Sequence, residues 1–295
     1  MVKLVEVATF TLEGHGRGCA FNPDGDRIAV GYYTSPYFRV LNFDKAAGTL
    51  TEVATFTLEG TSFGYAFNPD GDRIAVAHKG GDCFRVLNFD KAAGTLTNVA
   101  TFTLEGTGYG CAFNPDGDRI AVAHMSGDRF RVLNFDKAAG TLTEVATFML
   151  EGICYGCAFN PGGDRIAVAF AASPYFRVLN FDKVAGTLTE VATFTLETFG
   201  RGCAFNPDGD RIAVAHTGGD RFRVLNFDKV AGTLTEVATF TLEGDGHGCA
   251  FNPDGDRIAV AHYSSPYFRV LALVEVVLEN KSANMAAKMV AAGLI

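Results

Sequence analysis

Apolar and polar positions alternate in short runs along most of this chain, and turn residues separate the runs. Leu50–Leu58 alternates with a period of two and is rich in β-branched residues, which is typical of a half-buried strand. The tetrapeptide Asn22–Gly25 is a type I turn by composition, because Pro presets φ at its second position. The pattern predicts four antiparallel strands per unit, in the first unit Gly18–Asn22, Arg27–Tyr32, Phe38–Phe43 and Leu50–Leu58.

The same unit recurs with a fixed period. Phe-Asn-Pro begins at Phe21, Phe67, Phe113, Phe159, Phe205 and Phe251, always 46 residues apart. A period in the forties with four strands per unit predicts an all-β, six-bladed β-propeller of four-stranded blades over residues 1–271. Leu4–Leu12 is a fourth-strand sequence with no blade before it, so we expect this N-terminal strand to complete the last blade.

Residues 272–295 depart from the repeat, and we expect a C-terminal extension with a short helix in Ser282–Val290. Near-identical blades can also assemble between chains, so intermolecular blade sharing stays open beside the monomer that we expect.

Charge and cysteine usage narrow the function classes. A net charge of −8 opposes binding to nucleic acid or an anionic membrane, and the sequence contains no apolar segment long enough to span a bilayer. A secretory signal is not recognisable at the N-terminus. Five of the seven cysteines share one repeat position, which predicts buried thiols in a cytoplasmic protein. We expect no cofactor.

Two stretches of the repeat resemble known families. Asn114–His124 resembles the hairpin between the first two strands of WD40 and YVTN-type repeats, and Val132–Val145 is similar to the following hairpin of lactonase-like propellers. The Trp-Asp pair of WD40 repeats is replaced here, as at Leu133-Asn134. The resemblance covers residues 4–271 and implies a propeller, a fold that serves scaffolds, lectins and some enzymes.

We call the four strands of a unit A to D in chain order. The copies differ mainly in the connections between strands D and A and between strands B and C, which a propeller places on one face. We therefore predict a variable binding face on a fixed scaffold. Its candidate residues are His15, Arg17, Tyr32, Tyr33, Tyr37, Phe63, His78, Lys79, Asp82, Tyr109, His124, Met125, Asp128, Arg129, Tyr155, Phe170, Tyr175, Phe199, Arg201, His216, Asp220, Arg221, Asp245, His247, His262, Tyr263 and Tyr267.

The one-faced variation leads us to expect a non-enzymatic scaffold that binds a macromolecule, namely a protein. A lectin-like propeller that binds a glycan is the first alternative, and a lactonase-like hydrolase is the second. For the hydrolase, the best constellation is Asp245, His247, His15 and Arg17, which could meet across the boundary between the last and first blades.

Several motifs have plainer interpretations than the chemistry they suggest. His78, His124, His216 and His262 share one position, but strand B lies away from the axis, so we expect surface polar contacts and no metal ring. Cys154-x-x-Cys157 pairs a repeated core thiol with a variable position, so we do not expect a redox motif. The Asn-Pro-Asp-Gly-Asp turns lack the spacing of a calcium loop.

Overall fold

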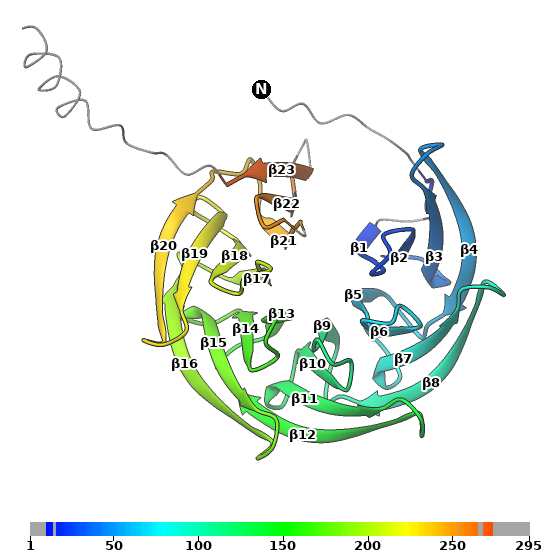
Figure 1. Cartoon of the computed structure of the whole chain (residues 1–295), viewed down its shortest axis with the longest axis horizontal. Coiled ribbons are helices and arrows are strands. Elements are labelled where there is room, and N and C mark those ends of the chain that lie inside the picture. Colours follow the sequence, from blue (N-terminus) through cyan, green and yellow to red (C-terminus); the bar gives the residue numbers. More distant parts are fainter. Residues whose placement is uncertain (1–9, 14–15, 253, 265–267, 274–295) are drawn as a thin grey trace, which may run out of the picture.

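Six β-sheets stand around a common axis in the computed structural model, which describes residues 10–13, 16–252, 254–264 and 268–273. Figure 1 shows the first strand of each sheet beside the central opening and the last strand at the outer rim. Every strand pair within a sheet is antiparallel and sequential, as the hairpin-rich repeat requires. The six-bladed propeller predicted from the 46-residue period is confirmed.

The first three blades have four strands each. Their bounds are β1 Gly16–Phe21, β2 Arg27–Tyr32, β3 Tyr37–Asp44, β4 Thr49–Thr57, β5 Ser62–Phe67, β6 Arg73–His78, β7 Cys83–Asp90, β8 Thr95–Thr103, β9 Gly108–Phe113, β10 Arg119–His124, β11 Arg129–Asp136 and β12 Thr141–Met149.

Blades 4 and 5 also have four strands, and three strands of blade 6 are described. Their bounds are β13 Cys154–Phe159, β14 Arg165–Phe170, β15 Tyr175–Asp182, β16 Thr187–Thr195, β17 Gly200–Phe205, β18 Arg211–His216, β19 Phe222–Asp228, β20 Thr233–Thr239, β21 Gly246–Phe251, β22 Arg257–His262 and β23 Phe268–Ala272.

The turn between strands A and B has the geometry that its sequence predicts. The Gly25 N–H donates to the Asn22 carbonyl at 3.0 Å, and Gly25 has a φ of 67°. The Asn22 side chain completes the turn, because its Nδ2 donates to Asp26 Oδ1 at 2.9 Å and its Oδ1 accepts the Arg27 N–H at 2.9 Å. The asparagine is therefore a structural residue of the hairpin.

Apolar clusters between neighbouring blades form the core. Phe84 and Val86 of blade 2, for example, pack in one buried cluster with Ile120 and Val122 of blade 3. Five such clusters join blades 1 to 6 in sequence order within the described residues. Burial of large apolar side chains against the next blade is the main stabilising term, since a single sheet cannot cover its own faces.

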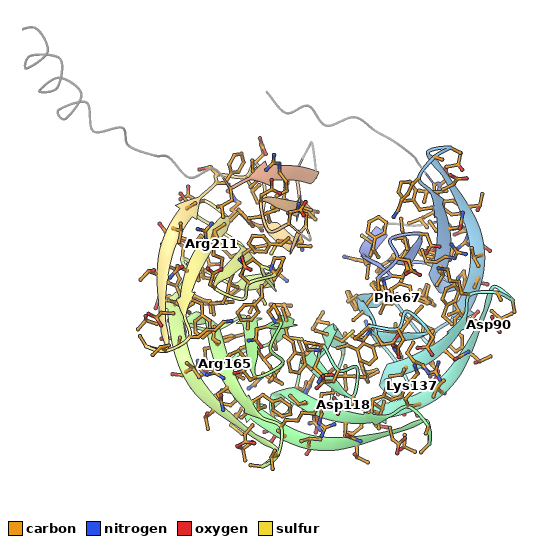
Figure 2. The ribbon with its side chains drawn as sticks, viewed as in Figure 1. Phe67, Asp90, Asp118, Lys137, Arg165 and Arg211 are labelled. Atoms are coloured by element: carbon orange, nitrogen blue, oxygen red, sulfur yellow. The ribbon has the colours of Figure 1, made fainter. Side chains whose placement is uncertain are left out.

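Ion pairs also join neighbouring blades, on the face with the A–B and C–D connections. Lys91 Nζ lies 2.7 Å from Asp24, and Lys137 Nζ lies 2.7 Å from Asp70 of the preceding blade. Figure 2 shows Asp90, the residue before Lys91, near the outer rim of the blade whose Phe67 lies beside the central opening. The invariant lysine thus joins blades 2, 3 and 4 to the blade before each, whereas Lys45 and Lys229 donate to carbonyl oxygens of their own blades.

The predicted N-terminal strand is described only from residue 10 onward, and the predicted helix lies outside the described residues. In the part of the chain that the structure describes, no helix could cross a membrane.

Candidate functional site

The two variable connections lie on the same face. The Tyr263 N–H, after strand B of blade 6, donates to the Asp245 carbonyl at 2.9 Å, and the Met125 N–H donates to Thr107 in blade 3 at 3.0 Å. Equivalent bonds in blades 2 to 6 tie the B–C connection to the D–A connection of the same blade, so these two connections lie on one face. The candidate residues are not all on its surface, because six of them are buried.

A bulge in the first strand of each blade positions the variable residue nearest the axis. Gly16 pairs with Tyr32 and Gly18 pairs with Gly31, so Arg17 is an extra residue without a partner on β2. The same irregularity recurs in every blade, and bulges of this kind redirect a side chain out of the regular ladder. We call the six bulged residues the axial collar: Arg17, Phe63, Tyr109, Tyr155, Arg201 and His247.

Collar side chains contact one another from blade to blade. The Phe63 and Tyr109 ring centroids are 5.1 Å apart, and those of Tyr109 and Tyr155 are 5.2 Å apart. Arg201 Cζ lies 4.2 Å from the Tyr155 ring centroid, and Arg17 Cζ lies 5.9 Å from that of Phe63. Each such cation–π contact is worth about 0.5–1 kcal/mol where it is exposed. The collar is therefore an aromatic arc with a guanidinium group at each end.

Both guanidinium groups act electrostatically on His247, the collar residue of blade 6. Burial lowers the pKa of its imidazole most, the positive charges of Arg201 and Arg17 lower it further, and Asp245 opposes them. The imidazole is therefore neutral at neutral pH. Asp245 is itself held by Arg221, whose Nε lies 3.6 Å from Asp245 Oδ1.

The structure brings many of the predicted site residues to this face. Side chains that are exposed or half-buried there are those of Arg17, Tyr33, Tyr37, Phe63, Lys79, Asp82, Tyr109, Met125, Asp128, Arg129, Tyr155, Tyr175, Phe199, Arg201, Asp220, Arg221, Asp245, His247 and Tyr263. His15 and Tyr267 lie outside the described residues. Of the predicted hydrolytic constellation, Arg17 and Asp245 both act electrostatically on His247.

A second group of predicted site residues is buried between the blades: Tyr32, His78, His124, Phe170, His216 and His262. The expectation that the four histidines make surface contacts was wrong. Arg131 Nε donates to His124 Nε2 at 3.2 Å, and Arg223 Nε donates to His216 Nε2 at 3.3 Å. These imidazoles accept hydrogen bonds from arginines that ion-pair with glutamates, as Arg131 does with Glu105 at 2.6 Å.

The cysteines are free thiols. Cys154 is fully buried, and burial raises the pKa of Cys157 to about 12. A thiol with so high a pKa is almost never ionised, so the C-x-x-C spacing does not form a reactive pair.

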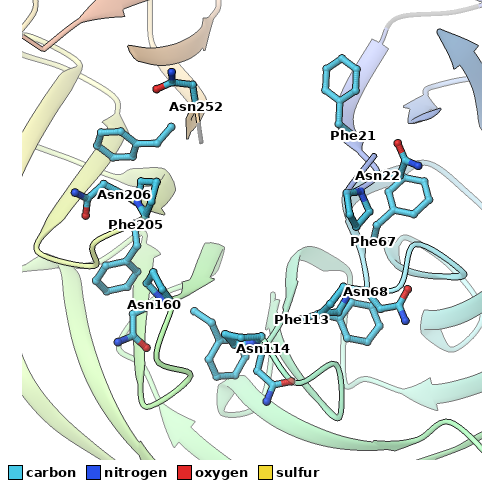
Figure 3. A pocket seen from close by; sticks show the side chains of 17 residues that line it. Phe21, Asn22, Phe67, Asn68, Phe113, Asn114, Asn160, Phe205, Asn206 and Asn252 are labelled. Atoms are coloured by element: carbon cyan, nitrogen blue, oxygen red, sulfur yellow. The ribbon is translucent and has the colours of Figure 1, made fainter. Parts of the chain in front are cut away.

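A cavity of 460 Å³ lies at the opposite end of the central opening, where the first strands end (Figure 3). The repeated Phe-Asn-Pro residues line it. Their asparagine side chains are engaged in the A–B turns, as described for Asn22. This mouth carries no titratable side chain among its lining residues, so acid–base chemistry is better placed at the axial collar.

Sequence reasoning identified the collar column but missed the bulge that turns it toward the axis. The signal was the Gly-x-Gly pattern around most collar residues, as at Gly108-Tyr109-Gly110. A Cβ on Gly110 would lie 2.8 Å from the Tyr155 carbonyl oxygen. The second glycine is therefore required by the close approach of the next blade's bulge.

Comparisons with known proteins point to lactonase-type propellers. The family model described as "Lactonase, 7-bladed beta-propeller" matches residues 64–154. No curated protein matches the sequence. A periplasmic gluconolactonase from Pseudomonas aeruginosa is similar in structure, with a TM-score of 0.72, 19% identity and coverage of 87% of this chain and 80% of that one.

A putative 6-phosphogluconolactonase from Bacteroides fragilis NCTC 9343 is also similar, with a TM-score of 0.74 and 17% identity over 87% of this chain and 79% of that one. At such identities the likeness shows the fold. The propeller resemblance is thus confirmed, and the matching family model describes a lactonase, not a WD40 repeat.

These findings correct the functional prediction. The match to a lactonase family model contradicts the prediction of a non-enzymatic, protein-binding scaffold. The scaffold was predicted because the residues vary between copies on one face only. That argument failed because the residues on the other face are needed for the structure and therefore do not vary. Its lysines and aspartates join the blades, and its asparagines hold the turns.

Proposed function

We propose that this protein is a lactonase-like hydrolase that opens a cyclic ester at the axial collar. The observation that carries the proposal is the axial collar, in which His247 is in the same ring of bulged residues as Arg17 and Arg201, whose charges lower its pKa. A neutral imidazole can accept a proton from water, and guanidinium groups stabilise negative charge that develops on a carbonyl oxygen. The match to a lactonase family model supports the same class of reaction.

In the proposed reaction, His247 accepts a proton from a water molecule while the water oxygen attacks the ester carbonyl carbon. The electron pair of the carbonyl bond moves to its oxygen, where Arg17 or Arg201 stabilises it. The carbonyl then re-forms, the ring C–O bond breaks, and the imidazolium returns its proton to the leaving oxygen. The product is a hydroxy acid, and no oxidant or co-reactant is consumed.

Aromatic collar residues suit the binding of a ring-shaped substrate. Tyr109 and Tyr155 present half-buried rings beside the catalytic groups. Aromatic faces pack against the C–H faces of a sugar-derived ring, while their hydroxyl groups bond its substituents. Because the Tyr155 ring contacts Arg201, it also fixes the direction of the guanidinium group.

The experiment is the hydrolysis of gluconolactone by the purified chain, followed by acid release and corrected for the spontaneous reaction. The double variant Arg17→Gln/Arg201→Gln removes both oxyanion-stabilising groups. We expect its kcat/KM to fall by about a hundredfold or more. The control Lys137→Gln removes a positive charge on the other face and should leave the rate unchanged.

If the chain accelerates hydrolysis and the double variant retains the full rate, catalysis does not occur at the collar. If the chain does not accelerate the opening of any of a panel of γ- and δ-lactones, the proposed class of reaction is wrong.

A further inference from the structure

The ring of blades is open at one place. In every blade a glycine directly follows the collar residue. In blades 1 to 5 this glycine lies close to the next blade: a Cβ on Gly202, for instance, would lie 2.7 Å from the His247 carbonyl oxygen. In a closed ring of six, Gly248 would meet Arg17 in the same way. A Cβ on Gly248 has nothing within 4 Å among the described residues. Figure 1 shows the corresponding gap between blade 6 and blade 1.

The blade 6 side of this seam is a face of small residues that stay partly exposed among the described residues. Ala261 and Ala250 are exposed, and Ala259 is half-buried. The counterparts of Ala259 and Ala261 in blade 3, Ala121 and Ala123, are completely buried against blade 4. Blade 6 therefore presents half of an interface of the kind that the chain makes five times.

The blade 1 side presents the other half. Phe21 is 56% exposed, and Ile28 and Val30 are only half-buried. The equivalent Ile74 and Val76 of blade 2 are completely buried against blade 1. Glu13 nevertheless pairs with Arg39, as Glu105 pairs with Arg131 across an intact interface. The segment that precedes blade 1 thus makes the same ion pair with its blade as the segment that precedes blade 3.

The angle between blades explains the opening. Nearly identical residues form all five interfaces, so each sets nearly the same rotation about the axis. If that rotation were one-sixth of a turn, blades 6 and 1 would meet without strain. They do not meet, so the rotation is smaller than a six-bladed ring needs. The family model that matches residues 64–154 is described as seven-bladed.

We infer that the seam is an interaction surface for one further blade of this same repeat. Its two faces repeat the faces of an established interface, which fixes the chemistry of the occupant: a four-stranded blade with Phe, Ile and Val toward blade 6 and Ala and Gly toward blade 1. The inference concerns assembly, and stability measurements test it without an activity assay.

The test compares two glycine-to-valine variants of the full chain. Gly110→Val places a side chain against the next blade and should lower Tm by about 4 °C or more. Gly248→Val points into the seam and should leave Tm unchanged or slightly raised, because valine favours strands. A Gly248→Val chain as destabilised as Gly110→Val would mean that the six blades close on themselves, and the inference would be wrong.

A second variant fills the seam by inserting a copy of residues 107–152 after Gly152, which gives seven repeats. We expect this chain to have a higher Tm and Cys19, which is exposed at the seam, to become as protected from alkylation as Cys111. Gly248→Val in this background should then cost as much as Gly110→Val. If the insertion leaves Tm, Cys19 labelling and the Gly248→Val effect unchanged, the seam does not accept a blade.

A second copy of the chain is the remaining occupant. In that case the six-repeat protein would be a dimer by light scattering, with a concentration-dependent loss of stability on Gly248→Val. This outcome would also overturn the inference.

Discussion

The phenol of Tyr65 in blade 2 fills the space that a side chain on Gly31 of blade 1 would occupy. Other blades have alanine at the Gly31 position and cysteine at the Tyr65 position, as in the pair Ala77 and Cys111. The Tyr65 hydroxyl donates to Ser62 Oγ, and its ring stacks on Phe38 at 5.5 Å. The two exceptional residues therefore compensate each other across one interface.

Gly31→Ala should destabilise the protein by about 3 kcal/mol, because its methyl group would overlap the Tyr65 ring. Tyr65→Cys should also destabilise, since it leaves a cavity beside Phe38. The double variant Gly31→Ala/Tyr65→Cys recreates the pair found between blades 2 and 3 and should recover much of the loss. Urea unfolding of the four proteins gives the coupling energy. Strict additivity of the two losses would contradict this packing.

The pH dependence of catalysis should report His247. Since burial and the charges of Arg201 and Arg17 lower its pKa, the acid limb of kcat/KM should lie below the ordinary histidine value of about 6.5. Removing one of those charges with Arg201→Gln should move the limb to higher pH. The measurement is kcat/KM between about pH 4.5 and pH 8, with Lys137→Gln as the control. A limb that does not move would show that Arg201 does not act on the titrating group.

The buried imidazole of His124 should make stability depend on pH. Burial, and to a lesser extent Arg131, lower its pKa to about 4. The unfolded chain binds this proton below about pH 6.5, so the folded state loses stability as pH falls from there to about 4. Below that pH both states are protonated, and this contribution levels off. The full difference is about 3 kcal/mol.

His124→Tyr should remove that dependence and keep the fold. Tyr32 occupies the same position in blade 1, where Arg39 Nε donates to its hydroxyl at 2.7 Å. Thermal melts of the two proteins at about pH 7 and pH 4.5 test this prediction. An equal loss of Tm on acidification in both would place the titrating group elsewhere.

The repeat period and the turn chemistry were enough to predict the propeller and most strand positions. The predicted Arg27–Tyr32 strand coincides with β2, and Leu50–Leu58 is shifted by one residue from β4. These succeed because alternation and Asn-Pro-Asp-Gly turns are local signals. The open seam is different, because it depends on a small rotation summed over five interfaces, and no single stretch of sequence encodes that sum.

The positions of the site residues could be predicted from the sequence, but the directions of their side chains could not. Variation between copies located His247 and Arg201, but it could not distinguish them from His124 and His216, which vary beside them. The outcome depends on where each side chain points. The residue after the bulge glycine, His247, is the extra residue of its strand, whereas His124 pairs with Gly108 and its side chain is completely buried.

The most direct test of the account is the rate of lactone opening by His247→Asn. Asparagine keeps the size and polarity of the side chain but cannot take up a proton. With the spontaneous rate subtracted, we expect kcat/KM for gluconolactone to fall by about a hundredfold or more while Tm stays close to that of the parent chain. A His247→Asn protein as active as the parent would contradict the assignment of the axial collar as the catalytic site.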